Sequence, residues 1–341
     1  MLEIDGSYGE GGGQILRNAV AFSVLTKKSI KITDIRANRP NPGIKAQHYV
    51  AMKSLAEICD AKTEGLEIGS ETITFKPGKI KGGRYNFDVG TAGSISLVFQ
   101  ACILACVKSK EQITINLSGG TDVKWSPSWD YFENVYLSLL KKMGLKVYPK
   151  LFIRGYYPRG GGEAVITISP CNKIKPLVLK DVEELKEVKG KVNISNLPEH
   201  ISKRIHDSAV RTFLKNDFMT SIEVDSSTSL SPGVGITLWS EGKKSIIGTG
   251  LLGEKGLSSE EVGKTASAAL LKEIASESNI DAYAFDQILP FMVLAKKQGK
   301  STCIVRELSN HASTNMWLIK QFFDVDFKVI QSEFNIKVEV F

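Results

Sequence analysis

The chain has 341 residues, of which 42% are hydrophobic and 24% are charged, a composition typical of a folded globular protein and not of a disordered one. This length supports a large core and two domains. The longest apolar run, residues 96–107, is well short of the ~20 residues that cross a bilayer, so no membrane partner is expected. The acidic N-terminus lacks the apolar stretch of a signal peptide, which predicts a cytoplasmic protein.

Charge and cysteine content further limit the class of protein and the partners that it can have. The formal net charge of +7 suits a polyanionic partner, although a solvated basic surface would give the same value. The five cysteines include no Cys-x-x-Cys pair, and Cys102 and Cys106 lie one helical turn apart in an apolar segment. We therefore expect reduced thiols in a core, and neither disulfides nor a zinc site.

One pattern recurs along the chain: a short β-branched run, a polar or glycine-rich loop, and then an amphipathic helix. It predicts a duplicated unit of sheet and helices. Because each loop lies at the same end of its unit, units assembled around a common centre would bring the loops to one site. The strand-like runs are residues 30–33, 113–117, 191–194 and 302–305, and the helices after them are expected to end near residues 59, 143, 214 and 323.

A change in composition predicts an inserted domain. Residues 181–191 are dense in charge, as in a surface crossing, and glycine clusters become rarer from there to about residue 278. The copy of the pattern that starts at Lys191 falls in this region, so it need not belong to the repeat. We expect an α/β protein of the α+β type, with a large domain formed by residues 1–181 and 279–341 and a smaller inserted α/β domain formed by residues 182–278.

The first motif in chain order, residues 9–13 (Gly-Glu-Gly-Gly-Gly), is a turn that leads into an apolar helix. Glycines let backbone amides approach an anion, and a helix N-terminus favours negative charge. The turn matches neither the Walker nor the dinucleotide-binding pattern, and a tight turn after a strand would look the same. Glu10 in the turn and Arg17 in the helix favour a site where a carboxylate holds a divalent metal beside phosphates.

The second motif, residues 36–48, is a basic loop stiffened by two prolines and followed by a predicted helix. The planar guanidinium groups of Arg36 and Arg39 suit two-point contacts with phosphate oxygens. Gln47 and His48 lie on the first turns of the helix. A solvated basic loop is an equal alternative, and packing against the start of the helix is the commoner role for a residue such as His48.

The next segments are less distinctive. A Gly/Ser/Thr turn at residues 88–96 leads into an apolar helix, in which Gln100 is a lone amide that needs a partner if it is buried. That partner is a ligand or, more commonly, a nearby backbone group. Tyr283, Asp286 and Gln287 offer a ring that can stack on a base and a carboxylate that can accept from a sugar, but an ordinary amphipathic helix explains them equally.

The last motif contains His311, one of only four histidines, in a polar segment between the strand-like run 302–305 and a helix-like run 316–323. We expect this segment to be a loop. A neutral imidazole at such a junction is exposed enough to attack a substrate and close enough to a helix start to meet an anion. For this segment by itself, a histidine that simply hydrogen-bonds within its loop is the commoner explanation.

Together, these motifs resemble those of the RNA 3′-terminal phosphate cyclase family. They occur in the family's order and extend over essentially the whole chain, and the combination is specific although each piece alone is not. The matching segments are residues 5–17, 36–43 with Gln47 and His48, 90–94, 118–122, 157–162, 286–287 and the segment around His311.

The resemblance implies a large domain of three similar units, each a small sheet backed by helices, with a smaller α/β domain inserted in the last unit. It implies a ligase that uses ATP to convert an RNA 3′-terminal phosphate to a 2′,3′-cyclic phosphate, releasing AMP and pyrophosphate. His311 would be the catalytic nucleophile and would form a covalent adenylyl-histidine before the adenylyl group passes to the RNA.

The resemblance also implies roles for other residues. Glu10 would help to hold a divalent metal, Mg or Mn. The residues around the phosphates and the RNA end would be Arg17, Arg36, Arg39, Gln47 and His48, and those lining the nucleotide pocket would be Gln100, Pro127, Tyr283, Asp286 and Gln287. Many bacterial members carry apolar residues just after the histidine, where this chain has Ala312 and Ser313, but the His-x-x-Thr-Asn spacing of residues 311–315 is kept.

Other functions compete with this one. A noncatalytic cyclase-like factor of ribosome biogenesis would share the fold, but that branch typically lacks the histidine nucleophile. A plain RNA-binding protein would explain the charge, and a transferase acting on a sugar phosphate would share the fold. The sequence is compatible with a monomer or a homodimer.

Overall fold

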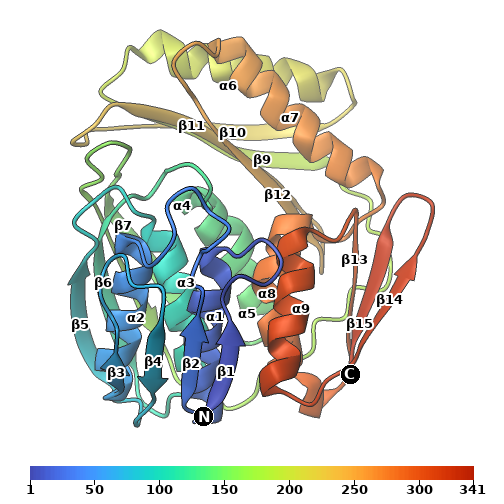
Figure 1. Ribbon diagram of the computed structural model, residues 1–341. Coiled ribbons are helices and arrows are strands. Elements are labelled where there is room, and N and C mark those ends of the chain that lie inside the picture. Colours follow the sequence, from blue (N-terminus) through green and yellow to red (C-terminus); the bar gives the residue numbers. More distant parts are fainter.

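The computed structural model describes all 341 residues as a mixed α/β protein with four separate sheets (Figure 1). This confirms the fold class that the sequence predicts. None of the helices has the combined length and hydropathy of a membrane span.

The first unit consists of β1 (Leu2–Asp5), α1 (Gly13–Thr26), β2 (Ile30–Thr33), α2 (Ala46–Cys59), β3 (Lys62–Glu64) and β4 (Ile73–Lys76). Its strands lie in the order β1-β2-β4-β3. β1 and β2 are parallel, and β4 is antiparallel to both of its neighbours. The strand–helix–strand start of the unit places the N-termini of both helices at the same end of the sheet.

The second unit repeats this plan with β5 (Gly83–Asp88), α3 (Ile95–Cys106), β6 (Ile113–Gly119), α4 (Trp129–Tyr131), η1 (Phe132–Tyr136), α5 (Leu137–Lys142), β7 (Val147–Ile153) and β8 (Gly162–Ile168). The segment η1 is a π-helical turn that joins α4 and α5 into one helical stretch. The strand order β5-β6-β8-β7 is that of the first sheet, again with the first pair parallel and the others antiparallel.

The third unit contains α8 (Ala282–Leu294), η2 (Lys296–Gln298), β13 (Ser301–Val305), α9 (Asn310–Phe322), β14 (Phe327–Gln331) and β15 (Ile336–Val340). Its order β13-β15-β14 corresponds to β2-β4-β3 of the first unit. The missing first strand is reduced to a parallel bridge between Val178 and Thr302. The chain therefore leaves the third unit near this bridge and returns to it with α8. In all, the sheet-plus-helices unit is present in three copies.

The remaining elements are β9 (Glu187–Ser195), α6 (Glu199–Leu214), β10 (Met219–Ser227), β11 (Gly233–Glu241), β12 (Ile246–Leu252) and α7 (Ser259–Ala275). The order β10-β9-β11-β12 differs from that of the first two sheets, because here the second strand along the chain, β10, lies at the edge, whereas there the first strand does. The copy of the pattern at Lys191 is therefore not part of the repeat. Helices α6 and α7 cover the outer face of this sheet and enclose a separate core with it (Figure 1). The limits at residues 182 and 278 stay a prediction.

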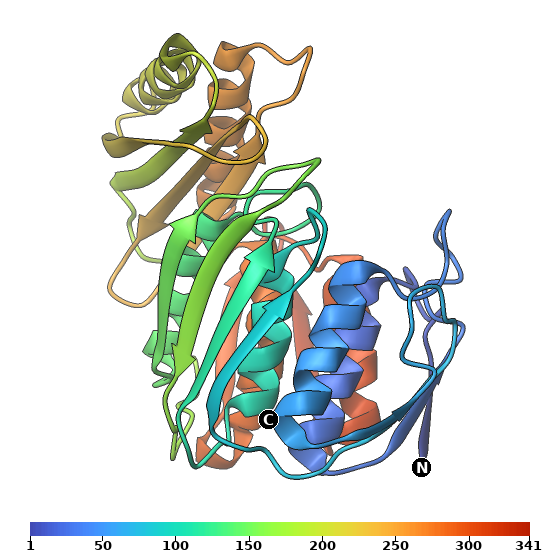
Figure 2. The same ribbon diagram turned by 90° about the vertical axis from the view of Figure 1, so that its left-hand side faces the viewer.

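The helices α1, α2, α3, α8 and α9 lie in the interior, with the first and second sheets on either side of them (Figure 2). Helix α3 shows why its sequence suits this place: every residue of residues 95–106 except Gln100 is buried, so the almost wholly apolar run forms a core helix. Cys102 and Cys106 are free and buried in this core, as the sequence predicts.

Candidate active site

The loops of the first and third units meet at one end of the central helices. The glycine-rich loop between β1 and α1 is joined to the arginine loop between β2 and α2, because Asn38 Nδ2 donates to the carbonyl of Ser7 (2.8 Å). The glycine-rich loop also lies against α9, where a Cβ on Gly9 would come within 2.5 Å of Thr314 Oγ1. Gly9 has φ +60°, so both the turn and the close approach require glycine.

His311 is the second residue of α9, and the prediction that it lies in a loop is wrong. The helix begins at Asn310 because the Ser309 hydroxyl accepts a hydrogen bond from the amide of Ala312 (2.9 Å) and caps the helix. This start lies well before Met316, where the apolar pattern begins. The imidazole therefore stands beside the free amides of a helix N-terminus, which favour negative charge.

The His311 ring is held by Gln14 and faces Glu10. Nδ1 lies 3.0 Å from Oε1 of Gln14, an oxygen that only accepts, so Nδ1 carries the proton and Nε2 keeps its lone pair. Nε2 lies 3.5 Å from Oε2 of Glu10. Burial lowers the pKa of His311 below its usual value, and two neighbouring arginines lower it further against the effect of Glu10. The ring is therefore neutral at neutral pH, with Nε2 available as a nucleophile.

Arg39 connects the arginine loop to Glu10. Its Nη2 lies 3.2 Å from Oε2 of Glu10, and both side chains are more than one-third exposed. Gly12 lies beside them, since a Cβ there would be 3.2 Å from Arg39 Nη2 and 4.0 Å from His311 Cε1. A cation and an imidazole thus lie beside the same carboxylate, and all three side chains remain partly open to solvent.

The other two predicted arginines are placed differently. Arg17 is partly buried, and burial lowers the pKa of its guanidinium to about 10, so it remains charged close to His311. Arg36 has φ +57° and donates through Nη1 to the carbonyls of Asn41 (2.8 Å) and Gly43 (3.1 Å). Part of the hydrogen-bonding capacity of Arg36 therefore shapes its own loop.

Gln47 and His48 start α2 and tie it to neighbouring loops. The His48 ring is 4% exposed and packs against Gly13, where any Cβ would overlap it. Its Nδ1 accepts from the amide of Lys45 (3.3 Å), and burial, with the nearby cations, lowers its pKa to about 3. Gln47 Oε1 accepts from the amide of Ser94 (3.0 Å). Through this bond the second unit reaches the same loop cluster.

Asp286 on α8 lies next to the cap of the histidine helix. The Ser309 hydroxyl lies 2.8 and 2.7 Å from the two carboxylate oxygens of Asp286, which is 5% exposed. Burial raises the pKa of Asp286 to about 7, although the Ser309 hydroxyl opposes this shift. A group bound to Asp286 would therefore lie near the start of α9 and so near His311.

The other predicted nucleotide residues are more dispersed. Gln100 Nε2 donates to Gln287 Oε1 (2.6 Å), so the lone amide of α3 pairs with a side chain of α8. Tyr283 stands on the first turn of α8 and is 65% exposed. Pro127 lies in the segment between β6 and α4, next to Ser128, whose hydroxyl accepts from the amide of Tyr131 and caps α4.

Sequence reasoning assigned no role to Gln14, Ser309 or Asn315. Asn315 is buried and joins three helices: its Nδ2 donates to the carbonyl of Asp286 (3.1 Å), and its Oδ1 accepts from Asn18 of α1 (3.0 Å). The signal that could have found these residues is an amide or hydroxyl on an otherwise apolar helix face, because such a group needs a partner once it is buried.

A divalent metal fits this site only with help from a substrate. The chain holds no cluster of three or more His, Cys, Asp or Glu side chains able to surround a metal ion. Glu10 offers one carboxylate beside His311. Magnesium commonly binds through one or two carboxylates, several waters and substrate phosphates. A single carboxylate therefore suits a metal that is coordinated largely by the phosphates of a bound substrate.

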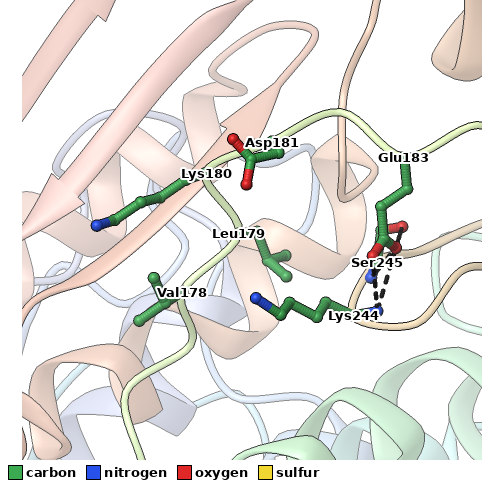
Figure 3. A pocket seen from close by; sticks show the side chains of 7 residues that line it. All are labelled: Val178, Leu179, Lys180, Asp181, Glu183, Lys244 and Ser245. Carbon is green, nitrogen blue, oxygen red and sulfur yellow. Dashed lines mark hydrogen bonds between the residues drawn. The ribbon is translucent and has the colours of Figure 1, made fainter.

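The hollow in Figure 3 lies elsewhere, between the linker that precedes β9 and the turn between β11 and β12. The Glu183 carboxylate fills its end by accepting from the amides of Lys244 (3.1 Å) and Ser245 (3.0 Å) and from the Ser245 hydroxyl (2.6 Å). None of the residues predicted for the active site lines it. The hollow is therefore part of the connection between the third unit and the fourth sheet.

Proteins of similar sequence match this chain over nearly its whole length. A sequence model of the RNA 3′-terminal phosphate cyclase family matches residues 8–329. The RNA 3′-terminal phosphate cyclase of Methanosarcina mazei is 42% identical over 100% of both chains. The enzymes of that name from Nitrosospira multiformis and Pyrococcus furiosus are each 42% identical, over 99% and 96% of this chain and 96% and 95% of their own. The chain belongs to the RNA 3′-terminal phosphate cyclase family.

Proposed function

We propose that the protein cyclises RNA 3′-phosphate ends in three chemical steps, the first of which attaches the adenylyl group of ATP to His311. Family membership supports the overall activity: the protein is an RNA 3′-terminal phosphate cyclase, an enzyme with ATP as co-substrate. The single observation that carries the histidine route is the neutral imidazole whose Nε2 faces Glu10 and the arginine loop.

In the first step, His311 Nε2 attacks the α-phosphorus of ATP. A P–N bond forms, the bond to the bridging oxygen breaks, and pyrophosphate leaves with the electron pair. The proton on Nδ1 stays on the ring, where its hydrogen bond to Gln14 stabilises the cationic adduct. Arg17 and Arg39 provide fixed positive charge where negative charge develops on the phosphate.

In the second step, an oxygen of the RNA 3′-phosphate attacks the same phosphorus, the P–N bond breaks, and neutral His311 is restored. In the third, the RNA 2′-hydroxyl attacks the neighbouring 3′-phosphorus, gives its proton to solvent and expels AMP. The hydroxyl and the phosphate are already adjacent, so this ring closure needs little further ordering. An end that lacks the 2′-hydroxyl can be adenylylated but cannot be cyclised.

The same proposal assigns supporting roles. Glu10 would hold a divalent metal, Mg or Mn, which when bound neutralises phosphate charge. The nucleotide would lie along Asp286, with Gln100, Pro127, Tyr283 and Gln287 around it. We also propose that residues 182–278 form an inserted domain, that Gln47, His48 and Arg36 keep the arginine loop in place for the RNA end, and that the protein works in the cytoplasm.

Labelling with ATP that carries its label on the α-phosphate tests the first step. The full-length protein is incubated with this ATP and Mg or Mn and is then separated under denaturing conditions. We expect a covalent label that is lost in acid and retained in base, because a phosphoramidate has those stabilities. A folded protein that acquires no label with either metal would contradict the proposal and favour the noncatalytic cyclase-like alternative.

Replacing Arg39 with alanine should slow adenylyl transfer to RNA by about 10- to 100-fold, because a charged hydrogen-bond donor to the 3′-phosphate is lost. The free energy of unfolding should change little, because the pair with Glu10 is partly exposed. The measurement is single-turnover transfer from isolated adenylyl-enzyme to a 3′-phosphorylated oligoribonucleotide. Arg84→Ala, which removes an exposed arginine from β5, is the matched control; equal rates in both variants would make the arginine loop a solvated surface.

A further inference from the structure

An aromatic pair on the rim of the active site has no role in the chemistry described above. The rings of Tyr8 and Trp317 are stacked, with centroids 3.8 Å apart and planes 8° apart. Tyr8 is 40% exposed, and Trp317 is partly buried beneath it. Stacked pairs also occur in the core, as in Phe99 with Phe132, but there both rings are fully buried. The Tyr8 ring therefore has one face covered by Trp317, while part of the residue remains open to solvent.

The pair is continuous with the site. Tyr8 comes directly before Gly9 and Glu10 in the glycine-rich loop. Trp317 lies on α9, the helix that carries His311, and a rise of 1.5 Å per residue places it roughly 9 Å further along the helix axis. Helices α1 and α9 pack side by side there (Figure 1). The glycine-rich loop therefore connects the pair to Glu10, which faces His311.

The loop does not need the pair as its anchor. Asn38 holds it at Ser7, Thr314 packs against Gly9, and Arg39 holds it at Glu10. A ring that served only to anchor the loop gains most when it is covered, yet Tyr8 keeps 40% of its surface exposed. Exposed aromatic rings beside basic groups are the usual means by which proteins hold single-stranded RNA, because every base has a face that can stack.

We propose that Tyr8, backed by Trp317, is a stacking platform for a base within the last two or three nucleotides of the RNA whose 3′-phosphate is bound beside Arg39. The distance of roughly 9 Å corresponds to two to three rises of about 3.4 Å along a stacked strand. The proposal rests on the proposed function for the position of the RNA end, and it adds a contact that the chemical steps do not require. The platform accepts any base, so it increases affinity without selecting a sequence.

The test measures binding of a 3′-phosphorylated single-stranded oligoribonucleotide to the full-length protein without ATP, by fluorescence anisotropy. Tyr8→Leu should weaken binding by about tenfold, because stacking on one base is lost, and Tyr8→Phe should stay within about twofold of the wild type because it keeps the ring. Tyr148→Leu removes an exposed tyrosine from β7, on the outer face of the second sheet, and is the matched control. Equal affinities for the wild type and Tyr8→Leu would overturn the platform.

Abasic RNA separates stacking from an indirect effect on the loop. The last three nucleotides are made abasic one at a time, and each RNA is bound to the wild type and to Tyr8→Leu. At one position the abasic change should weaken wild-type binding by about tenfold and have no further effect on Tyr8→Leu. Equal losses in both proteins at every position would overturn the proposal, because Tyr8 would then act without touching a base.

The labelling experiment tests the proposed function, and the binding experiment tests the platform, so their outcomes can be told apart. If the wild-type protein forms no adenylate but shows the base-specific coupling to Tyr8, the proposed function is wrong and the stacking platform is supported. If the protein forms the adenylate but the abasic changes and Tyr8→Leu have only additive effects on RNA binding, the proposed function is supported and the platform is wrong.

Discussion

Replacing His311 with alanine should abolish the adenylyl-enzyme, with a loss of on the order of 10³-fold or more in the rate of labelling from ATP. The reason is chemical: without the imidazole no atom of the site can form the P–N bond, and the remaining charges can only bind the nucleotide. The measurement is the rate of covalent labelling by ATP labelled on the α-phosphate. Transfer to RNA should be lost to the same extent, because it uses the same intermediate.

The variant should fold normally. The His311 side chain is 44% exposed and makes one hydrogen bond, to Gln14, so its removal leaves no buried charge behind. His206→Ala is a matched control, since this histidine lies on α6 and pairs only with its neighbour Asp207. A covalent label that persists in His311→Ala at the wild-type rate would refute the assignment of the nucleophile.

Replacing Arg154 with alanine should lower the free energy of unfolding by about 3–5 kcal/mol, because it leaves buried carboxylates without their partner. Arg154 is 3% exposed and lies 3.2 Å from Asp122, 3.0 Å from Asp130 and 2.7 Å from Asp225. Asp122 and Asp130 are each 1% exposed. Although burial opposes the charge on Arg154, these carboxylates raise its pKa above the usual value. Urea denaturation of the full chain measures the loss.

The positions of Arg154 and its partners indicate which part of the molecule the substitution destabilises. Arg154 and Asp122 belong to the second unit, whereas Asp225 lies on β10 of the fourth sheet. Asn193 of β9 adds to it, since its Nδ2 donates to Asp130 (3.3 Å) and its Oδ1 accepts from a tyrosine hydroxyl. One buried cation therefore fixes the fourth sheet on the second unit, and its removal should loosen that junction first.

Two controls identify burial as the cause. Arg204→Ala removes an arginine with equally short contacts to Glu260, 2.6 and 2.7 Å, but on an exposed surface, so its effect should be small. Adding Asp122→Asn and Asp130→Asn to Arg154→Ala should recover part of the lost stability, because the unpaired charges are then removed. Equal losses from Arg154→Ala and Arg204→Ala would contradict this account.

Local pattern predicted much of the fold. The helices ending at Cys59, Leu214 and Phe322 and the strands that precede them lie within a few residues of the expected places, since apolar periodicity responds to the burial of one helix face. The error at α9 has a physical cause. Its first turn faces the site with polar side chains, so periodicity starts late, and the true start depends on the hydrogen bond that caps the helix at Ser309.

The sequence predicts which side chains belong to the candidate site but not which of them contact one another. Glycines, arginines and one histidine mark loops where a phosphate can bind, and a repeated unit suggests that such loops converge. The pattern left open which of these side chains face a ligand and which bind within the protein. Arg36 binds its own loop and His48 packs on Gly13, whereas Arg39 stays partly exposed beside Glu10.

The local elements and the chemical groups that each loop offers follow from short stretches of sequence, because helix and strand formation and capping depend mainly on residues close together in the chain. Which groups act together depends on contacts between segments that are far apart in the chain. His311 and Gln14 are 297 residues apart, and the proton on Nδ1 is set by their contact. Such contacts follow from how three similar units and a fourth sheet pack around common helices, and no local pattern encodes that packing.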